Sequence, residues 1–285
     1  MGYAVDMLVE LYHYLTTPCS HTHRRLGYLT DLLGLQARYR RIGDHWQQHL
    51  HNSRHLILQS AQQCTRHNRV TIIGSGLLLD IPLVQLSTLF NEVILIDVIQ
   101  SRAVRQRCKQ LGNVTPVEHD ITGLAESLTR ANTHNKLPTS VARLPSAALA
   151  SDLIISCNLL TQLAHTPSRY LIKKQGWHAD DPQLQQWQRT IMAEHLSLLA
   201  QQDGQCCLIC DTDHEYRDKS ENVIEQQERL LGLPLGKADQ QWQWPIAPFG
   251  EFDKQHQLLA TVQGFCNWSV NSTGTPPSNS QKDSQ

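Results

Sequence analysis

The chain has 285 residues, of which 40% are hydrophobic, and its formal net charge at pH 7 is -1. This length suits one globular domain with an appended region, and the balanced charge argues against a protein that binds nucleic acid mainly through a basic surface. No segment reaches the ~18 consecutive apolar residues that a membrane span requires, and the first residues lack the basic start and cleavage site of a secretory signal. We therefore expect a cytoplasmic protein.

Eight cysteines are spread through the sequence, and half of them lie in apolar, strand-like runs: Cys157, Cys206, Cys207 and Cys210. Such positions favour reduced thiols in a core over a disulfide framework. Cys207 and Cys210 form a C-x-x-C motif, but residues three apart on a strand point to opposite faces. We therefore expect core thiols here and no metal or redox site.

Three amphipathic helices are predicted before the first strand, because apolar residues recur three and four positions apart. They cover residues 3–15, 23–42 and 44–63, with Asp44 as the N-cap of the third. The region is rich in arginine and histidine, which would favour an anionic acceptor or RNA phosphate. A solvated helix face explains the same residues, and we favour it because the basic density is below that of nucleic-acid binders.

The most informative segment is VTIIGSGLLLD, residues 70–80, which is followed by VILID, residues 93–97. An apolar run that breaks into Gly-x-Gly, then a helical stretch, then a second apolar run closed by an acid is typical of a nucleotide-binding βαβ unit. Gly74 and Gly76 would allow a tight turn and close approach of a ligand. The following helix would direct its N-terminal amides into the same crevice, and Asp97 could accept hydrogen bonds from ribose hydroxyls.

NAD(P) and S-adenosylmethionine are both bound by this layout, and the glycines help to separate them. Dinucleotide sites favour a third small residue for close helix packing, and this chain has Leu79 there. S-adenosylmethionine has no phosphate to cradle, so it needs only the tight turn. At this point the chain resembles the class I S-adenosylmethionine-dependent methyltransferases, with the subfamily not identified.

Later segments extend the resemblance over roughly residues 68 to 270. Residues 113–122 are predicted to form a third strand ending in Asp120, residues 151–160 a fourth ending at Asn158, and residues 205–213 a fifth. Residues 242–246 and 256–268 would form the antiparallel hairpin that closes the family's sheet. The predicted fold is α/β, with a Rossmann-like, seven-stranded, mostly parallel sheet preceded by helices.

The resemblance also implies cofactor contacts and a domain organisation. The implied contacts to S-adenosylmethionine are Gly74, Ser75, Gly76, Asp97, Val98, Asp120, Ile121 and Asn158. We expect an N-terminal helical region over 1–66 that shapes the acceptor pocket, a cofactor-binding domain over 67–270 and a disordered tail over 271–285. The tail has nothing apolar to bury beyond its prolines.

The glycine motif departs from the family in two places. Many members carry an acid just before the first glycine and a third glycine further on, where this chain has Ile73 and Leu78. The acid helps to hold the methionine amino group, so that end of the cofactor lacks an assigned partner. Asp80, predicted within the following helix, could partly replace it.

The acceptor side is expected at the carboxyl ends of the fourth and fifth strands. Residues 165–181 look like a loop insertion there, before a helix that starts at Pro182. A polar turn and a helix are predicted after the fifth strand. Asp211, Asp213, His214 and Glu215 lie at that strand end, and Asn158, Asp213 and His214 are the catalytic candidates. Helix capping and a solvated turn are the alternative explanation.

Three functions remain open. The first is a methyltransferase with a small-molecule acceptor, since Leu159 and Leu160 follow Asn158 where base-methylating enzymes carry a (D/N/S)PP(Y/F/W) motif. The second is a non-catalytic protein of the same fold that binds a partner through its N-terminal helices. The third is an NAD-linked oxidoreductase. The oligomeric state, the acceptor and the methylated atom stay undetermined.

Overall fold

The computed structural model describes residues 14–130 and 136–269, and its centre is one eight-stranded sheet. Seven strands follow the order β3-β2-β1-β4-β5-β8-β7, and the eighth, β6, pairs with β5 off this path. In chain order the strands are β1 (Arg69–Ile73), β2 (Glu92–Asp97), β3 (Val114–Glu118), β4 (Leu153–Cys157), β5 (Gln205–Arg217), β6 (Val223–Glu228), β7 (Gln240–Ala247) and β8 (Gln257–Phe265). Strands β1 to β5 are parallel, and β6, β7 and β8 are antiparallel additions. The predicted fold class, with its closing hairpin, is confirmed.

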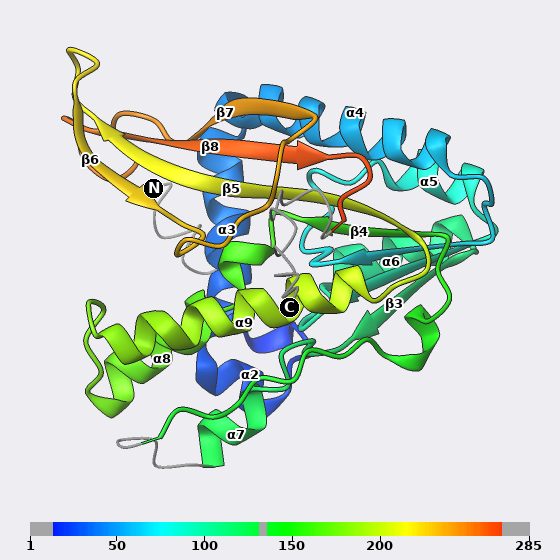
Figure 1. Cartoon of the computed structure of the whole chain (residues 1–285), viewed down its shortest axis with the longest axis horizontal. Coiled ribbons are helices and arrows are strands. Elements are labelled where there is room, and N and C mark those ends of the chain that lie inside the picture. Colours follow the sequence, from blue (N-terminus) through cyan, green and yellow to red (C-terminus); the bar gives the residue numbers. More distant parts are fainter. Residues whose placement is uncertain (1–13, 131–135, 270–285) are drawn as a thin grey trace, which may run out of the picture.

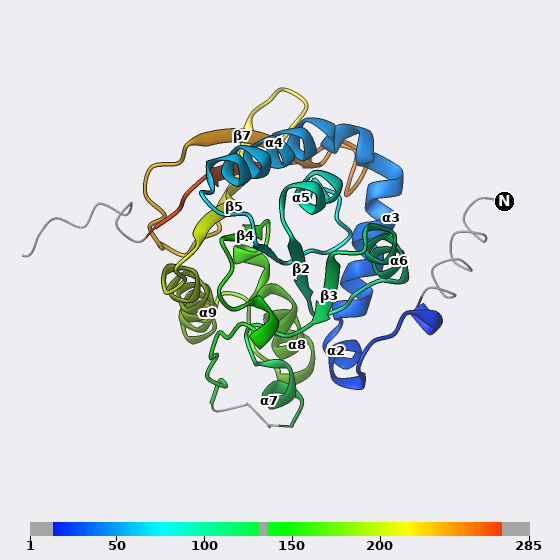
Figure 2. The ribbon, with the colours of Figure 1, turned by 90° about the vertical axis from the view of Figure 1, so that its right-hand side faces the viewer.

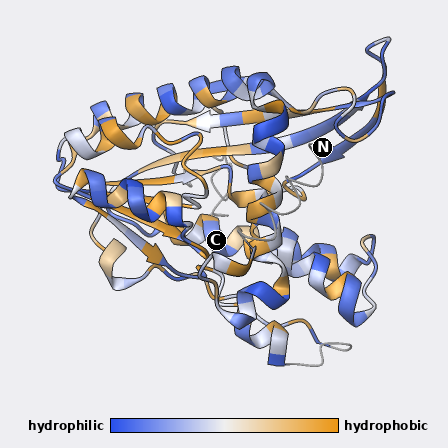
Figure 3. Ribbon diagram, turned by 180° about the vertical axis from the view of Figure 1, so that it is seen from behind, coloured by the Kyte–Doolittle hydropathy of each residue, from blue (hydrophilic) through white to orange (hydrophobic). Residues whose placement is uncertain are grey.

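Helices cover both faces of this sheet (Figures 1 and 2). One layer contains α4 (Gln47–Gln63), α5 (Leu83–Leu89) and α6 (Arg102–Leu111), and the other contains α7 (Ala125–Arg130), α8 (His165–Gln175) and α9 (Pro182–Ala200). Successive residues of a strand pack against the two layers in turn, because their side chains point to alternate faces of the sheet. Val93 and Leu95 pack towards α4 to α6, whereas Ile94 and Ile96 pack towards α7 to α9. Figure 3 shows the resulting apolar interior under polar outer helix surfaces.

The N-terminal helices differ in detail from the prediction. The helix expected over 23–42 is divided at Gly27, whose φ of 104° ends α2 (His21–Leu26) before α3 (Tyr28–Ile42) begins. Asp44 is not an N-cap, because it lies inside the 3-10 helix η1 (Gly43–Trp46), and Trp46 precedes α4. The helix predicted over 3–15 lies outside the described residues except for its last two, which are helical, and the tail prediction lies outside them entirely.

Three predictions near the carboxyl edge of the sheet are wrong. Residues 77–82 form a loop, so α5 begins well after the glycine turn and Asp80 is not helical. The supposed insertion contains the helix α8, which buries Tyr170 and Leu171 in the core. The turn and helix expected after the fifth strand are instead the continuation of β5 and the new strand β6, because pairing with β5 determines the conformation of this polar segment.

Short 3-10 helices complete the described chain at η2 (Ser146–Ala148) and η3 (Leu160–Gln162). Within the described ranges, none of the helices combines the length and apolar character that a bilayer span needs.

Candidate functional site

The strand order reverses at the carboxyl ends of the neighbouring strands β1 and β4. The chain runs from β1 outward to β2 and β3 and then returns to β4 on the other side of β1, so the order reverses between these two neighbours. Open α/β sheets bind ligands at such a reversal, because the two connections leave in opposite directions and open a gap. Gly74 follows β1 and Asn158 follows β4, which brings both predicted residues to this point.

The glycine turn has the backbone conformation that the sequence predicts. Gly74 and Gly76 have φ values of 77° and 49°, in the left-handed region that side chains rarely adopt. The N–H groups of Gly74 and Ser75 donate to the carbonyl oxygen of Ile96 at 2.9 and 3.2 Å, which ties the turn to β2. A Cβ on Gly74 would lie 3.0 Å from the Cβ of Leu159, so this side chain packs closely over the turn.

Asp97 ends β2 beside that turn. Its Oδ2 accepts the N–H of Gly76 at 2.7 Å, and its Oδ1 accepts the N–H of Ile99 at 3.4 Å. Burial raises the pKa of Asp97, although backbone N–H groups oppose the shift. The ring of Tyr28, at the start of α3, lies near this carboxylate and that of Asp120, and its own pKa is raised by burial and then by these charges. At the carboxyl end of β2, Asp97 therefore offers a hydrogen-bond acceptor to uncharged donor groups.

Asp120 follows β3 and is strongly bonded within its own turn. Its carboxylate accepts the N–H and the hydroxyl of Thr122 at 3.0 and 2.6 Å, and the N–H of Ala125 at 2.9 Å. The last bond caps the start of α7. A carboxylate has about four acceptor positions, so room for one further donor remains. Ile121 beside it is buried, and Val98 after Asp97 is partly buried.

Asn158 lies at the centre of a polar cluster. Its φ is 51°, and its N–H donates to the carbonyl oxygen of Ile209 at 2.8 Å. Its Nδ2 donates to Oδ2 of Asp80 at 2.7 Å and lies 3.1 Å from Nε2 of His49. The Sγ of Cys157 also donates to Asp80, at 3.3 Å. The Oδ1 of Asn158 is buried without a hydrogen-bond partner.

His49, on the first turn of α4, enters this cluster from the helical layer. The Nε1–H of Trp242 donates to its Nδ1 at 3.1 Å, and the ring of Trp244 stacks on it with centroids 4.0 Å apart. Burial lowers the pKa of His49 to about 4, although the nearby carboxylates of Asp80 and Asp211 oppose the shift. The ring is therefore neutral at neutral pH. The sequence alone predicts only a helical region rich in arginine and histidine here, with no role for His49.

A second buried cluster lies where β5 passes the end of β4. Nε2 of His214 donates to Oδ2 of Asp211 at 2.8 Å, and the hydroxyl of Thr161 donates to Oδ1 at 2.5 Å. Burial alone would raise the pKa of Asp211, but these two hydrogen bonds outweigh it and hold the pKa below its usual value. His214 is thus paired with Asp211. The predicted Asp213 instead accepts the hydroxyl of Thr212 at 2.8 Å.

The four cysteines of the strand-like runs are buried, as expected for core thiols: Cys157, Cys206, Cys207 and Cys210. Each of the eight is free, and Cys207 and Cys210 lie in the cores on opposite sides of the sheet. Burial raises the pKa of both thiols well above the usual value. Within residues 14–130 and 136–269, no three histidine, cysteine or acidic side chains are grouped so as to hold a metal ion.

No family model matches the sequence, and no curated protein matches it. Solved structures do. The N-methyltransferase NodS from Bradyrhizobium japonicum, in complex with S-adenosyl-L-homocysteine, is 14% identical with a TM-score of 0.35, over 75% of this chain and 86% of that one. The 1,6-didemethyltoxoflavin N1-methyltransferase from Burkholderia thailandensis, with its substrate and S-adenosylhomocysteine, is 13% identical with a TM-score of 0.38, over 87% and 92%. An rRNA methylase from Streptococcus thermophilus is 13% identical with a TM-score of 0.34, over 75% and 96%.

These values describe a distant likeness and assign no substrate. The strand order, the glycine turn and the antiparallel hairpin of the chain itself agree with the class I methyltransferase fold.

Proposed function

We propose that this protein is an S-adenosylmethionine-dependent methyltransferase that acts on a small-molecule acceptor. The contact between the N–H of Gly76 and Oδ2 of Asp97, at 2.7 Å, is the observation that carries the proposal. It joins a left-handed glycine turn to a carboxylate at the point where the strand order reverses. A ribose with two hydroxyl donors and an extended methionine chain suit this arrangement, because the carboxylate accepts and the turn leaves room.

The donor site follows from the order of side chains along the edge. Gly74, Ser75 and Gly76 would lie under the methionine part, and Asp97 would accept the ribose hydroxyls. Further along, the remaining predicted contacts would surround the adenine: Val98, Asp120 and Ile121. Asn158 would face the position where donor and acceptor meet, since it ends the neighbouring strand β4.

Bound S-adenosylmethionine would supply the methyl group for an in-line displacement by the acceptor's lone pair, with S-adenosylhomocysteine as the leaving group. The protein has to align the two reactants and exclude water. A proton lost by the acceptor needs a base, and His214 is the candidate. Because its Nε2 donates to Asp211, the lone pair of the neutral ring lies on Nδ1, which would take the proton while Asp211 would stabilise the imidazolium. Asp213 and Asn158 remain candidates for positioning the acceptor.

A small molecule is favoured because of the residues after β4. Leu159 packs on the glycine turn and Leu160 is buried in the core, so the segment lacks an aromatic clamp for a flipped base. The near-neutral charge of the chain also offers little general attraction to a nucleic acid.

A non-catalytic role for the same fold is supported by one observation. Leu159 lies against Gly74, and Ile73 stands where the family carries an acid, so the methionine end of the site is narrower and less polar than the resemblance implies.

Two titrations separate these functions. Calorimetry with S-adenosylhomocysteine and with NADH should show binding of the first alone, whereas binding of NADH alone would favour the oxidoreductase. The purified protein should then be incubated with a cell extract and with S-adenosylmethionine labelled in the methyl group. We expect the label to appear in the small-molecule filtrate. Label in the RNA or protein fraction would contradict the small-molecule acceptor. Binding of S-adenosylhomocysteine with no transfer to any fraction would support the non-catalytic role.

A further inference from the structure

A pocket of about 470 Å³ lies between α4, the loop at residues 77–82, α5 and α6. Figure 2 shows these three helices on the same side of the sheet. Among the described residues, those that line the pocket do not include the glycine turn, Asp97 or Asn158, so it is separate from the proposed cofactor site. Its volume is within the range of sites that bind small molecules.

Two arginines and two histidines line this pocket: His51, Arg54, His55 and Arg107. Nη2 of Arg54 donates to the carbonyl oxygen of Leu79, which holds the guanidinium group beside the loop. Nη1 of Arg107 donates to Oε1 of Gln110 at 3.3 Å. Neither arginine forms an ion pair with any residue in the described part of the chain. The pocket therefore has two guanidinium groups and no carboxylate to balance them.

The surrounding helices add no negative charge. α4, α5 and α6 contain no aspartate or glutamate, although the whole chain has a formal net charge of only -1. The loop contains Asp80, but its Oδ2 accepts from Asn158 and Cys157, and it does not line the pocket. A concave surface with charges of one sign attracts ligands of the opposite sign. The pocket is therefore suited to an anion.

The remaining wall of the pocket is largely apolar. Leu58 of α4 and Leu78 of the loop are half-buried, and Ile81 is buried below them. A bare inorganic anion would leave these side chains in contact with water, whereas an apolar group on the ligand would cover them. The combination of two arginines with an apolar wall indicates an organic anion.

We propose that this pocket binds a phosphate monoester, with the phosphate at the arginines and the apolar group against the leucines. A phosphate monoester carries about -1.5 to -2 charges near neutral pH and three terminal oxygens. Two guanidinium groups can donate to these oxygens and balance the charge, whereas a carboxylate has one charge and two oxygens. The rings of His51 and His55, stacked with centroids 6.4 Å apart, would supply further N–H donors. The inference goes beyond the proposed function and does not depend on it.

Three small probes and three variants test the pocket by calorimetry. The probes are hexyl phosphate, inorganic phosphate and hexanoate. Arg54→Gln and Arg107→Gln each remove one positive charge from the pocket and keep a long polar side chain. The matched control is Lys109→Gln, which removes a positive charge from the same helix α6 at a residue that does not line this pocket. Thermal melts show whether each variant is folded.

Hexyl phosphate should bind the wild type at least about tenfold more tightly than inorganic phosphate, because its alkyl chain leaves water. Each arginine variant should weaken hexyl phosphate at least about fivefold, whereas Lys109→Gln should leave it unchanged. Three results would overturn the inference: no saturable binding to the wild type, an equal loss in Lys109→Gln, which would indicate only a diffuse positive field, and equal affinity for hexanoate, which would exclude selection for phosphate.

Two sources carry this chemistry, a soluble phosphate ester and the headgroup of a phospholipid. Phosphatidylcholine vesicles that bind only when they contain phosphatidic acid, and that lose the binding in Arg107→Gln, would assign the ligand to a lipid. Binding of hexyl phosphate without binding of these vesicles would assign it to a soluble ester.

A titration with S-adenosylhomocysteine separates this inference from the proposed function. The wild type should bind hexyl phosphate and S-adenosylhomocysteine together, and Arg107→Gln should keep its affinity for the second. Competition between the two ligands, with loss of both in Arg107→Gln, would place the pocket in the cofactor site and overturn the inference. Protein that binds hexyl phosphate through its arginines but does not bind S-adenosylhomocysteine would refute the proposed function and not the pocket.

Discussion

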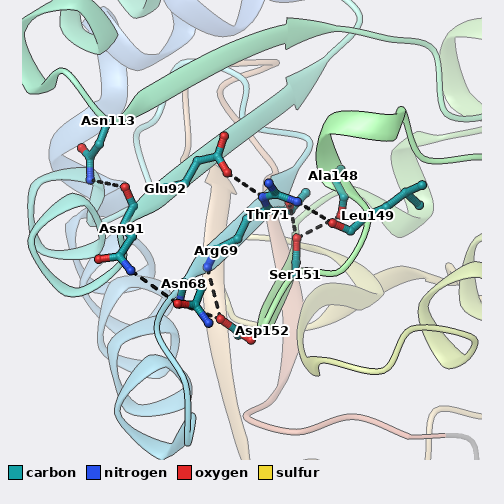
Figure 4. A network of polar contacts seen from close by, with 10 residues as sticks. All are labelled: Asn68, Arg69, Thr71, Asn91, Glu92, Asn113, Ala148, Leu149, Ser151 and Asp152. Atoms are coloured by element: carbon teal, nitrogen blue, oxygen red, sulfur yellow. Dashed lines mark hydrogen bonds and ion pairs between the residues drawn. The ribbon is translucent and has the colours of Figure 1, made fainter.

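The polar groups at the two edges of the parallel sheet differ in how completely they are hydrogen-bonded. At the amino edge, Oδ2 of Asp152 accepts the N–H groups of Asn68 and Arg69 at 2.6 and 3.2 Å, and the hydroxyls of Thr71 and Ser151 lie 2.7 Å apart (Figure 4). Ser151 donates onward to the carbonyl oxygen of Ala148 at 3.0 Å. Each of these groups finds its partner within the chain, so this edge is built for stability.

The carboxyl edge leaves groups unsatisfied. Oδ1 of Asn158 and Oε1 of Gln100 are buried without partners, and Asp97 and Asp80 form no ion pair in the described part of the chain. The same strands supply both edges, so the difference comes from the loops that follow β1, β2 and β4. The contrast between the two edges agrees with ligand binding at the carboxyl edge.

The largest effect is expected at Asp97. Asp97→Ala should weaken binding of S-adenosylhomocysteine by about 2–4 kcal/mol, because two hydrogen bonds to a charged acceptor are lost. Calorimetry measures the change directly. Unchanged affinity in a folded variant would remove Asp97 from the cofactor site.

Asp152→Ala is the matched change at the amino edge. It should leave the affinity for S-adenosylhomocysteine unchanged and lower the free energy of unfolding, because two backbone N–H groups and Arg66 lose their acceptor. A loss of affinity equal to that of Asp97→Ala would show that the contrast between the edges is not functional.

A pair of glycines gives the next largest effect. A Cβ on Gly204, before β5, would lie 2.0 Å from the carbonyl oxygen of Ser151, so Gly204→Ala must displace backbone at the amino edge. We expect a loss of about 3 kcal/mol in urea unfolding, with cofactor affinity retained in the folded fraction. Gly76→Val should do the reverse: the nearest atom to its Cβ is 3.9 Å away, so no clash displaces the backbone, and the cost to folding is the strain of a branched side chain at a φ of 49°, about 1–2 kcal/mol. Cofactor binding should be abolished. Similar stability losses in the two variants would contradict the comparison.

The glycine turn and Asp97 could be predicted from local sequence patterns. The role of His49 could not, because it depends on contacts with residues that are distant in the sequence. A tight turn after an apolar strand and an acid at the end of the next strand are both short-range signals. His49 receives its role from Asn158 and Trp242, which are 109 and 193 residues away. No spacing along the chain reports such contacts.

Three segments differ from the sequence prediction: β6, α8 and the loop that holds Asp80. The polar segment of β6 has the composition of a helix, and its strand conformation comes from pairing with the extended β5. The helix α8 occupies the expected loop insertion, and its Pro167 lies in the first turn, where the missing N–H leaves no hydrogen bond broken. Asp80 was placed in a helix because the turn was expected to lead directly into one.

Acid should destabilise the protein through two buried histidines that contact the carboxyl half of β4. Nε2 of His195 lies 2.9 Å from the hydroxyl of Ser156, and burial lowers the pKa of His195, like that of His49, from 6.5 to about 4. The unfolded chain therefore takes up these protons at higher pH than the folded protein. Stability is fully present above pH 6.5 and falls as the pH drops towards 4.

Each ring should lower the free energy of unfolding by about 2 kcal/mol between pH 7 and pH 5. Urea unfolding at both pH values should show His195→Leu losing about half of this dependence, whatever its stability at pH 7. The control His51→Leu, at an exposed position on α4, should retain all of it. An unchanged difference in His195→Leu would mean that this ring is not buried in its neutral form.

The smallest effect is expected between the two edges, at Cys207. Its side chain is fully buried in the layer of α4, α5 and α6, next to the hydroxyl of Ser60. Cys207→Ser should lower the free energy of unfolding by about 1 kcal/mol, because a more polar group is buried with a hydroxyl nearby to bond it. The affinity for S-adenosylhomocysteine should not change, since the residue lies in the middle of β5 and away from both edges. Stoichiometric zinc in the purified protein that is lost in the serine variant would show that the thiol is a metal ligand, against its placement on the opposite face from Cys210.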